Sequence, residues 1–94
     1  MSTANVEQTV KGMLSSELMV EIPAGQMNAD DSLRDVYGLD SLGFVELRVL
    51  CEENFGVTVS EDDFSPENFG TLGMVVSLVE RLLKERESSA QSSG

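Results

Sequence analysis

The sequence contains no histidine, one cysteine and only six basic residues, and each shortage narrows the range of functions. A nucleophilic serine needs an adjacent base, usually an imidazole, so the lack of histidine excludes a serine hydrolase of the usual kind. A single cysteine cannot form an internal disulfide, which fits a reducing compartment. The chain has neither an apolar run long enough to cross a bilayer nor a secretory signal, so we expect a cytoplasmic protein.

Acidic residues dominate the charge, since 17 Asp and Glu stand against six Lys and Arg and the net charge is −11. This balance argues against nucleic acids and membranes as partners and favours proteins that present basic patches. At 94 residues the chain forms one small domain with little room to enclose a catalytic cleft. We therefore expect a monomer that is not an enzyme.

Helical periodicity runs along the chain and no convincing strand is present, so the predicted fold class is all-α. We expect main helices over residues 5–19, 41–55 and 71–87, and a short third helix beginning at Ser65-Pro66-Glu67. The expected core stripes of the first and last helices are Val6, Val10, Met13, Leu14 and Leu18, and Leu72, Val75, Val76, Val79 and Leu83. The prediction is a small four-helix bundle within residues 1–87, followed by a disordered tail over 88–94.

A long connection over residues 20–40 joins the first two expected helices. A loop of this length in a small domain is usually functional or disordered. Four apolar residues favour an ordered loop pinned onto the core: Ile22, Leu33, Val36 and Tyr37.

The 41–55 helix has two apolar faces, of which one is an ordinary core stripe made of Phe44, Leu47, Leu50, Cys51 and Phe55. The opposite face carries small aliphatic residues among acids, namely Leu42, Val45 and Val49 with Glu46, Glu52 and Glu53. Apolar surface rimmed by charge of one sign is typical of a docking site for a basic partner. The alternative is that these are ordinary exposed aliphatics on an acidic, solvated face.

Ser41 begins this helix within the stretch Gly38-Leu39-Asp40-Ser41-Leu42. The spacing G-x-x-S-x-G differs from the G-x-S-x-G of a nucleophile elbow, and no strand precedes it. A serine beside an aspartate at a helix start is most often a helix cap. The same position also suits an attached phosphodiester, because free N–H groups and the helix dipole stabilise an anion there.

Residues 32–55, S-L-R-D-V-Y-G-L-D-S-L-G-F-V-E-L-R-V-L-C-E-E-N-F, resemble the signature region of acyl carrier proteins. The resemblance implies that a phosphopantetheinyl transferase attaches 4′-phosphopantetheine from coenzyme A to Ser41, and that Asp40 helps this enzyme engage. The arm would carry acyl groups as thioesters to partners such as an acyltransferase or a ketosynthase, and a short acyl chain could enter the core near Leu47, Leu50 and Val76. The six residues of the apolar-acidic face match the positions through which family members dock: Leu42, Val45, Glu46, Val49, Glu52 and Glu53.

Two residues depart from the housekeeping fatty-acid type, because Arg48 puts a positive charge on an acidic helix and Gly43 replaces the usual acid after D-S-L. These departures suggest a carrier for a specialised pathway such as polyketide assembly. The remaining alternative is an acidic helical adaptor that binds a basic protein noncovalently and is never modified.

Two further candidates for chemistry are set aside. Cys51 lies on the core stripe, so we expect a buried, inert thiol. The run Glu61-Asp62-Asp63 lacks the ligand spacing and the glycine of a calcium loop, so no metal site is expected.

Overall fold

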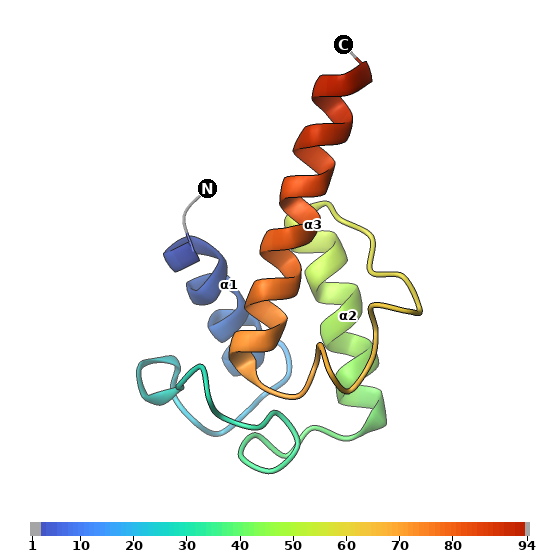
Figure 1. The fold of residues 1–94 in the computed structure, drawn as a ribbon. Helices are drawn as coiled ribbons and strands as arrows, with labels where there is room; N and C mark the ends of the chain where they lie inside the picture. Colours follow the sequence, from blue (N-terminus) through green and yellow to red (C-terminus); the bar gives the residue numbers. More distant parts are fainter. Residues whose placement is uncertain (1–2, 94) are drawn as a thin grey trace.

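The computed structural model describes the backbone of residues 3–93 and the side chains of residues 5–86. It contains α1 (Thr3–Ser16), the 3-10 turn η1 (Ala24–Gln26), α2 (Ser41–Phe55) and α3 (Leu72–Ser93). Helix α1 runs opposite to α2 and α3, so the N-terminal ends of α2 and α3 lie at the same end of the molecule (Figure 1). The all-α prediction is confirmed: over the described backbone, the extended pairing is limited to one isolated bridge between Ser32 and Thr71.

Helix α1 begins and ends earlier than predicted. Its first residue is Thr3, and the Thr9 hydroxyl donates to the carbonyl of Asn5 at 2.8 Å, so Asn5 lies inside the helix and does not cap it. The helix ends at Ser16. The predicted apolar face is confirmed for Val6, Val10, Met13 and Leu14, which are all buried, whereas half-buried Leu18 lies beyond the end of the helix.

Helix α2 has the predicted bounds, Ser41 to Phe55. Asp40 is the N-cap, and its Oδ1 accepts a hydrogen bond from the N–H of Gly43 at 2.8 Å. Gly56 ends the helix with φ 65°, a left-handed conformation that favours glycine. Ser41 is therefore the first residue of the helix, and Asp40 is its cap.

The predicted short third helix is wrong, so within residues 3–93 the bundle has three α-helices and not four. After Pro66 the chain makes only one turn, in which the carbonyl of Ser65 accepts from the N–H groups of Asn68 and Phe69 at 3.1 and 3.0 Å. The turn is not continued because Gly70 is drawn into another contact, where its carbonyl accepts from Leu33 N–H at 3.1 Å. A helix this short has little to offset the cost of nucleation.

Helix α3 is longer than predicted. Its predicted core residues Leu72, Val75, Val76, Val79 and Leu83 are all buried. The helix then continues to Ser93, and Gly94 lies outside the described residues. The disordered tail expected over residues 88–94 stays a prediction. Once a helix is nucleated, each further residue adds one hydrogen bond, and no proline or glycine interrupts residues 87–93.

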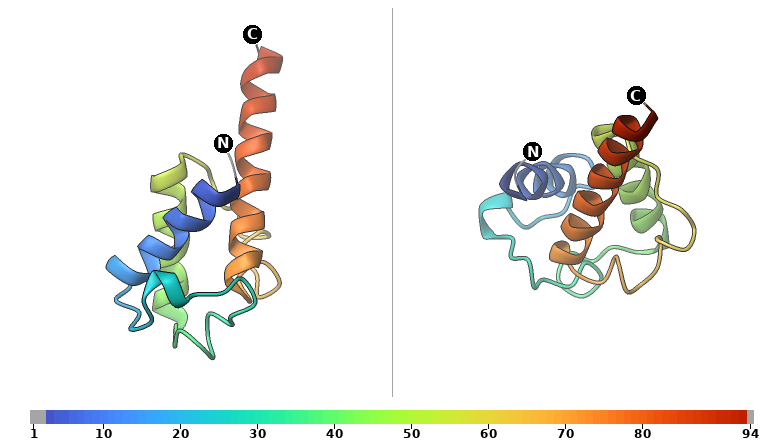
Figure 2. Two further views of the ribbon diagram at one scale, coloured as in Figure 1. Left: turned by 90° about the vertical axis from the view of Figure 1, so that its left-hand side faces the viewer. Right: turned by 45° about the horizontal axis from the view of Figure 1, so that its top comes forward.

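The connection over residues 17–40 is ordered and forms the lower end of the molecule (Figures 1 and 2). The start of α3 fastens it: Leu72 N–H donates to the Asp31 carbonyl at 3.1 Å, and Gly73 N–H to that of Ala29 at 2.9 Å. Gly73 permits this approach, because a Cβ there would lie 3.1 Å from the Ala29 carbonyl oxygen. The loop anchors are confirmed for buried Leu33 and Tyr37 and half-buried Ile22, whereas exposed Val36 is not an anchor.

Tyr37 also organises the connection through its hydroxyl, which donates to Asp31 Oδ2 at 2.8 Å. The same oxygen accepts from the N–H of Asn28 at 2.8 Å. Burial, followed by the bond to the Asp31 carboxylate, raises the pKa of the Tyr37 phenol well above its ordinary value. The phenol therefore stays neutral and keeps its proton for the hydrogen bond to Asp31.

Candidate functional site

Ser41 is exposed at the first position of α2, between the ordered connection and the helix. Within residues 5–86, no side-chain hydrogen bond uses its hydroxyl. The first turn of a 15-residue helix surrounds it with N–H groups and the positive end of the helix dipole. These features suit a hydroxyl that accepts an anionic group.

The local structure explains why residue 43 is a glycine. A Cβ added to it would lie 3.1 Å from Leu39 Cδ2 and 3.4 Å from the capping oxygen of Asp40. Leu39 is buried, so it has little freedom to move aside. The glycine thus accommodates the tight entry of the chain into α2, at a cost in helix propensity.

A groove of about 480 Å³ opens beside Ser41, between α2 and the loop over residues 57–70, which we call the 57–70 loop. Its walls include Phe44 and Val45 of α2 and Phe64 and Phe69 of the loop. The Phe64 and Phe69 rings meet edge to face with centroids 5.0 Å apart. Sequence reasoning missed this groove, because no local pattern shows that the two loop rings face α2.

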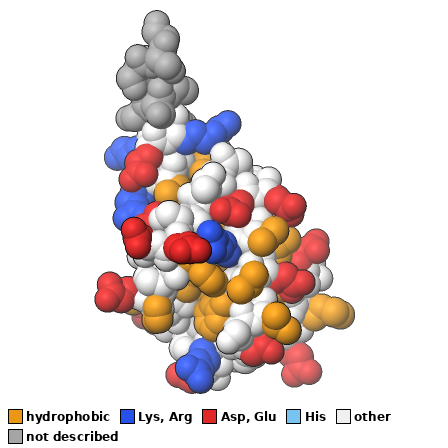
Figure 3. Space-filling model, turned by 90° about the vertical axis from the view of Figure 1, so that its right-hand side faces the viewer, with side chains coloured by type: hydrophobic (Ala, Val, Ile, Leu, Met, Phe, Trp, Pro, Cys, Tyr) orange, Lys and Arg blue, Asp and Glu red, His pale blue; other side chains and the backbone are white. Residues whose placement is uncertain are grey.

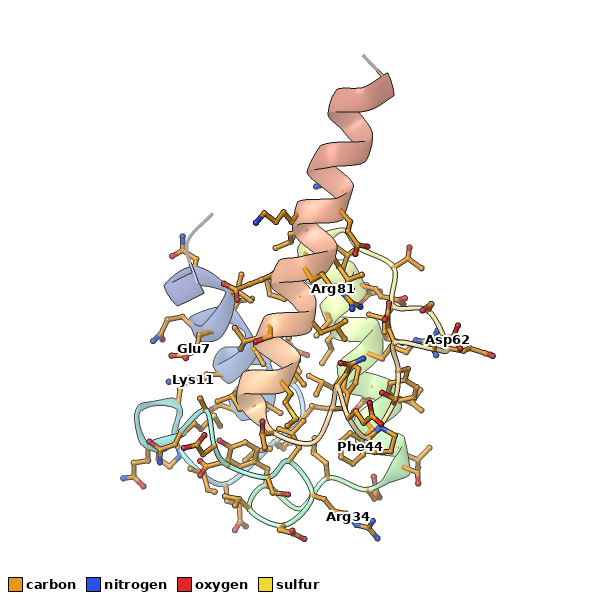
Figure 4. The ribbon with its side chains drawn as sticks, in the orientation of Figure 1. Glu7, Lys11, Arg34, Phe44, Asp62 and Arg81 are labelled. Atoms are coloured by element: carbon orange, nitrogen blue, oxygen red, sulfur yellow. The ribbon has the colours of Figure 1, made fainter. Side chains whose placement is uncertain are left out.

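Arg34 is the basic residue of the groove lining and is exposed at its edge. In Figure 4 its side chain extends at the lower end of the molecule, below the start of α2, while Phe44 lies between α2 and the 57–70 loop. The lining also contains the acidic Asp35, next to Arg34 in the chain. A mainly apolar groove with a cation at its edge fits a phosphopantetheine arm, which joins an anionic phosphodiester to a mostly uncharged chain. The residues that would hold such an arm are Ser41, Arg34 and the aromatic walls.

The structure exposes five of the six predicted docking residues. Leu42, Val45 and Val49 are 79%, 48% and 42% exposed, and Glu46 and Glu53 are exposed as well. Figure 3 looks onto the side formed by α2 and the 57–70 loop, where hydrophobic side chains gather among acidic ones. We call Leu42, Val45, Glu46, Val49 and Glu53 the docking face.

The sixth predicted docking residue, Glu52, has a structural role, and its part in docking stays a prediction. Glu52 is half-buried, and its Oε2 accepts a hydrogen bond from the N–H of Val59 at 2.8 Å. Arg48 completes the contact, because its Nη2 donates to the carbonyl of Val59 at 2.7 Å. Val59 is fully buried, so both of its backbone polar groups need partners, and two α2 side chains one turn apart supply them.

Arg48 also lies over the ring of Phe64, with its Cζ 5.1 Å from the ring centroid. Its charge therefore holds the 57–70 loop through a cation–π contact and the bond to Val59. The unexpected arginine of the sequence is explained by this packing.

The predicted ligand cavity near Leu47, Leu50 and Val76 is not the groove beside Ser41, whose walls are other residues. Leu47 and Val76 are buried in the core, and Leu50 packs against it. Cys51 is buried as predicted, and burial raises the pKa of its thiol to about 12, so the thiolate needed for reaction does not form near neutral pH.

Neither a metal cluster nor a membrane span emerges from the described residues. Residues 5–86 contain no group of three His, Cys, Asp or Glu placed to hold a metal ion. Asp63 of the acidic run instead pairs with Arg81 at 2.5 Å. No helix in the described part of the chain is long and apolar enough to cross a membrane.

Comparison with known proteins agrees with this site. The family model described as "phosphopantetheine attachment site" matches residues 8–84. An acyl carrier protein of Thermotoga maritima is 35% identical over 82 residues, which cover 87% of this chain and 96% of that protein. A D-alanyl carrier protein of Streptococcus suis is 34% identical over 79 residues, covering 84% of this chain and 96% of the relative.

A solved structure shares the fold as well. The acyl carrier protein of Enterococcus faecalis superposes with a TM-score of 0.71 at 26% sequence identity, over 87% of this chain and 99% of the other. The family model, the curated relatives and the shared helical architecture agree. The chain belongs to the acyl carrier protein family, and it is a carrier with a covalently attached phosphopantetheine group.

Proposed function

We propose that Ser41 is the residue to which phosphopantetheine is attached. The observation that carries this proposal is the position of an exposed hydroxyl at the N-terminus of α2, beside an apolar groove edged by Arg34. The helix N-terminus and the guanidinium would both stabilise the phosphodiester. When attached, the arm supplies a terminal thiol that holds the cargo as a thioester.

The attachment itself requires chemistry that this chain does not supply. Ser41 Oγ forms a bond to the phosphorus that bears the pantetheine arm of coenzyme A, and the bond from that phosphorus to the bridging oxygen breaks. Adenosine 3′,5′-bisphosphate leaves, and a base of the transferase takes the serine proton. The sequence has no histidine and Asp40 is committed to its cap, so we propose that the chain is a substrate and carrier without catalytic groups of its own.

Intact mass spectrometry tests the attachment site. Apo protein incubated with coenzyme A and a broad-specificity phosphopantetheinyl transferase should gain one phosphopantetheinyl group. Ser41→Ala should gain none, while Ser77→Ala, which alters an exposed serine of α3, should be modified like the wild type. A wild type that stays unmodified would favour the noncovalent adaptor, and a modified Ser41→Ala would move the attachment to another residue.

We further propose that partner enzymes bind the docking face through basic patches. Its aliphatic residues are 42–79% exposed, and between residues 5 and 86 neither Glu46 nor Glu53 takes part in an ion pair. An acyltransferase and a ketosynthase are partners of this kind. Since Gly43 and Arg48 both have local structural causes, neither residue favours polyketide assembly over another acyl pathway.

A further inference from the structure

A second hollow, of about 580 Å³, lies on another side of the α2 N-terminus. The groove beside Ser41 uses Phe44 and Val45, whereas this hollow uses Leu42, Gly43 and Glu46 on the neighbouring face of the same helical turns. The chain segment after α1 and the connection leading to Asp40 close it from below. Ser41 therefore lies between two depressions of different character.

Met19 is the residue of this hollow that the fold does not explain. It has φ 56°, a left-handed conformation that favours glycine, and its side chain is 80% exposed. The reversal after α1 depends on backbone bonds, namely Leu18 N–H to the Met13 carbonyl at 3.0 Å and Val20 N–H to the Leu14 carbonyl at 2.9 Å. A glycine would make the same turn with less strain, so the methionine side chain is not needed for the turn.

The hollow combines exposed apolar side chains with charge of one sign. Met19, Val36 and Leu42 are 80%, 44% and 79% exposed. Four acidic residues share the lining with them, Glu21, Asp35, Asp40 and Glu46, and no lysine or arginine does. A complementary partner presents an apolar side chain flanked by lysine or arginine.

The position of the hollow selects among partners. Enzymes that act on the thiol of the arm work at a full arm's length from Ser41. The transferase must instead reach the Ser41 oxygen itself, and so it must cover the residues on both sides of the serine. Asp40 and Leu42, the two neighbours of Ser41, both line the hollow.

We propose that this hollow, with Met19, Val36 and Leu42 at its rim, is the anchoring site of the phosphopantetheinyl transferase. A basic segment of the transferase places an apolar side chain against Met19 and pairs its charges with the surrounding acids. The hollow shares Leu42 and Glu46 with the docking face, whereas Val45, Val49 and Glu53 lie outside the hollow and remain available to enzymes that act on the cargo. This inference rests on the modification of Ser41 proposed above.

Initial rates of modification test the proposal, with apo protein, coenzyme A and the transferase as reactants. Met19→Gly should raise the KM for apo protein about fivefold at unchanged kcat, because an exposed anchor contact is lost. The same variant should melt at the wild-type temperature or above, because glycine suits the positive φ. Opposite effects on binding and stability distinguish a docking residue from a folding residue.

Matched controls make the result specific. Met19→Gln should weaken binding to the transferase, as Met19→Gly does. Met74→Gln should not weaken it, because Met74 is a methionine of α3 that is 46% exposed and lies outside the hollow. Glu21→Gln should also flatten the rise of KM with salt, unlike Glu61→Gln on the far loop. Equal KM values for the Met19 and Met74 variants would overturn the proposal. A wild type that is never modified would instead refute the attachment site itself.

Discussion

In its first half helix α2 leaves Ser41, Leu42, Val45 and Glu46 exposed, whereas in its second half Arg48 and Glu52 hold a buried loop residue. Both halves contain apolar and acidic residues. The difference is what lies alongside, because the 57–70 loop crosses the second half and brings Val59 within reach of two side chains. Charged side chains of one helix therefore differ in role, because Glu46 stays exposed whereas Arg48 and Glu52 pack against the loop.

The largest difference in folding stability is expected between charge reversals in the two halves of α2. Glu52→Lys leaves the buried Val59 N–H without its acceptor and should lower the free energy of unfolding by about 2 kcal/mol. Glu46→Lys should leave the urea midpoint unchanged and weaken transfer to partner enzymes. Urea denaturation and partner kinetics on both variants check this. Equal stability of the two variants would remove the distinction between the two halves.

Arg48→Met sharpens the same comparison with a change that keeps the apolar stem. The variant loses the bond to the Val59 carbonyl and the contact over Phe64, which together should cost about 1.5 kcal/mol. Arg86→Met, on an exposed arginine of α3, is the control. If urea midpoints of both variants match the wild type, Arg48 does not fasten the loop.

Asp40→Ala tests the exposed end of the helix, where capping is the main structural contribution. Loss of the bond from Gly43 N–H to Oδ1 should cost about 1 kcal/mol, seen as a lower thermal midpoint. Asp40→Asn keeps a capping oxygen and should recover most of that stability. If the transferase also modifies Asp40→Asn slowly, the charge of Asp40 contributes to the transferase reaction in addition to capping the helix.

The ionisation of Cys51 should have the smallest effect on folding stability near neutral pH, because the thiol keeps its proton there. The folded-state pKa is raised from 9.0 to about 12, so the contribution to stability is full below the unfolded pKa and is lost as pH rises toward 12. We expect wild type to lose more stability than Cys51→Ala between pH 8 and 10.5, measured by urea unfolding. At pH 8 the native thiol should resist a disulfide reagent; parallel pH curves or rapid labelling would contradict burial.

The sequence was sufficient for features set by neighbouring residues. Asp40 and Gly56 mark the ends of α2 through their own side chain and backbone preference, and these bounds are confirmed. The apolar periodicity of α1 and α3 likewise selected residues that are buried. The prediction of a short helix after Ser65 failed because a residue distant in the sequence uses its backbone: the N–H of Leu33 donates a hydrogen bond to the carbonyl of Gly70.

The sequence by itself determined that this protein is helical, acidic and without an imidazole, and that a serine begins its central helix. Only the tertiary structure decided which side chains around that serine are free. In the folded chain Glu52 accepts a hydrogen bond from Val59, and a groove and a hollow lie on two sides of Ser41. The physical reason is distance along the chain. Which residues of α2 share a face follows from the local sequence, but the segments that cover those faces or leave them exposed lie elsewhere in the chain, near residues 19 and 59.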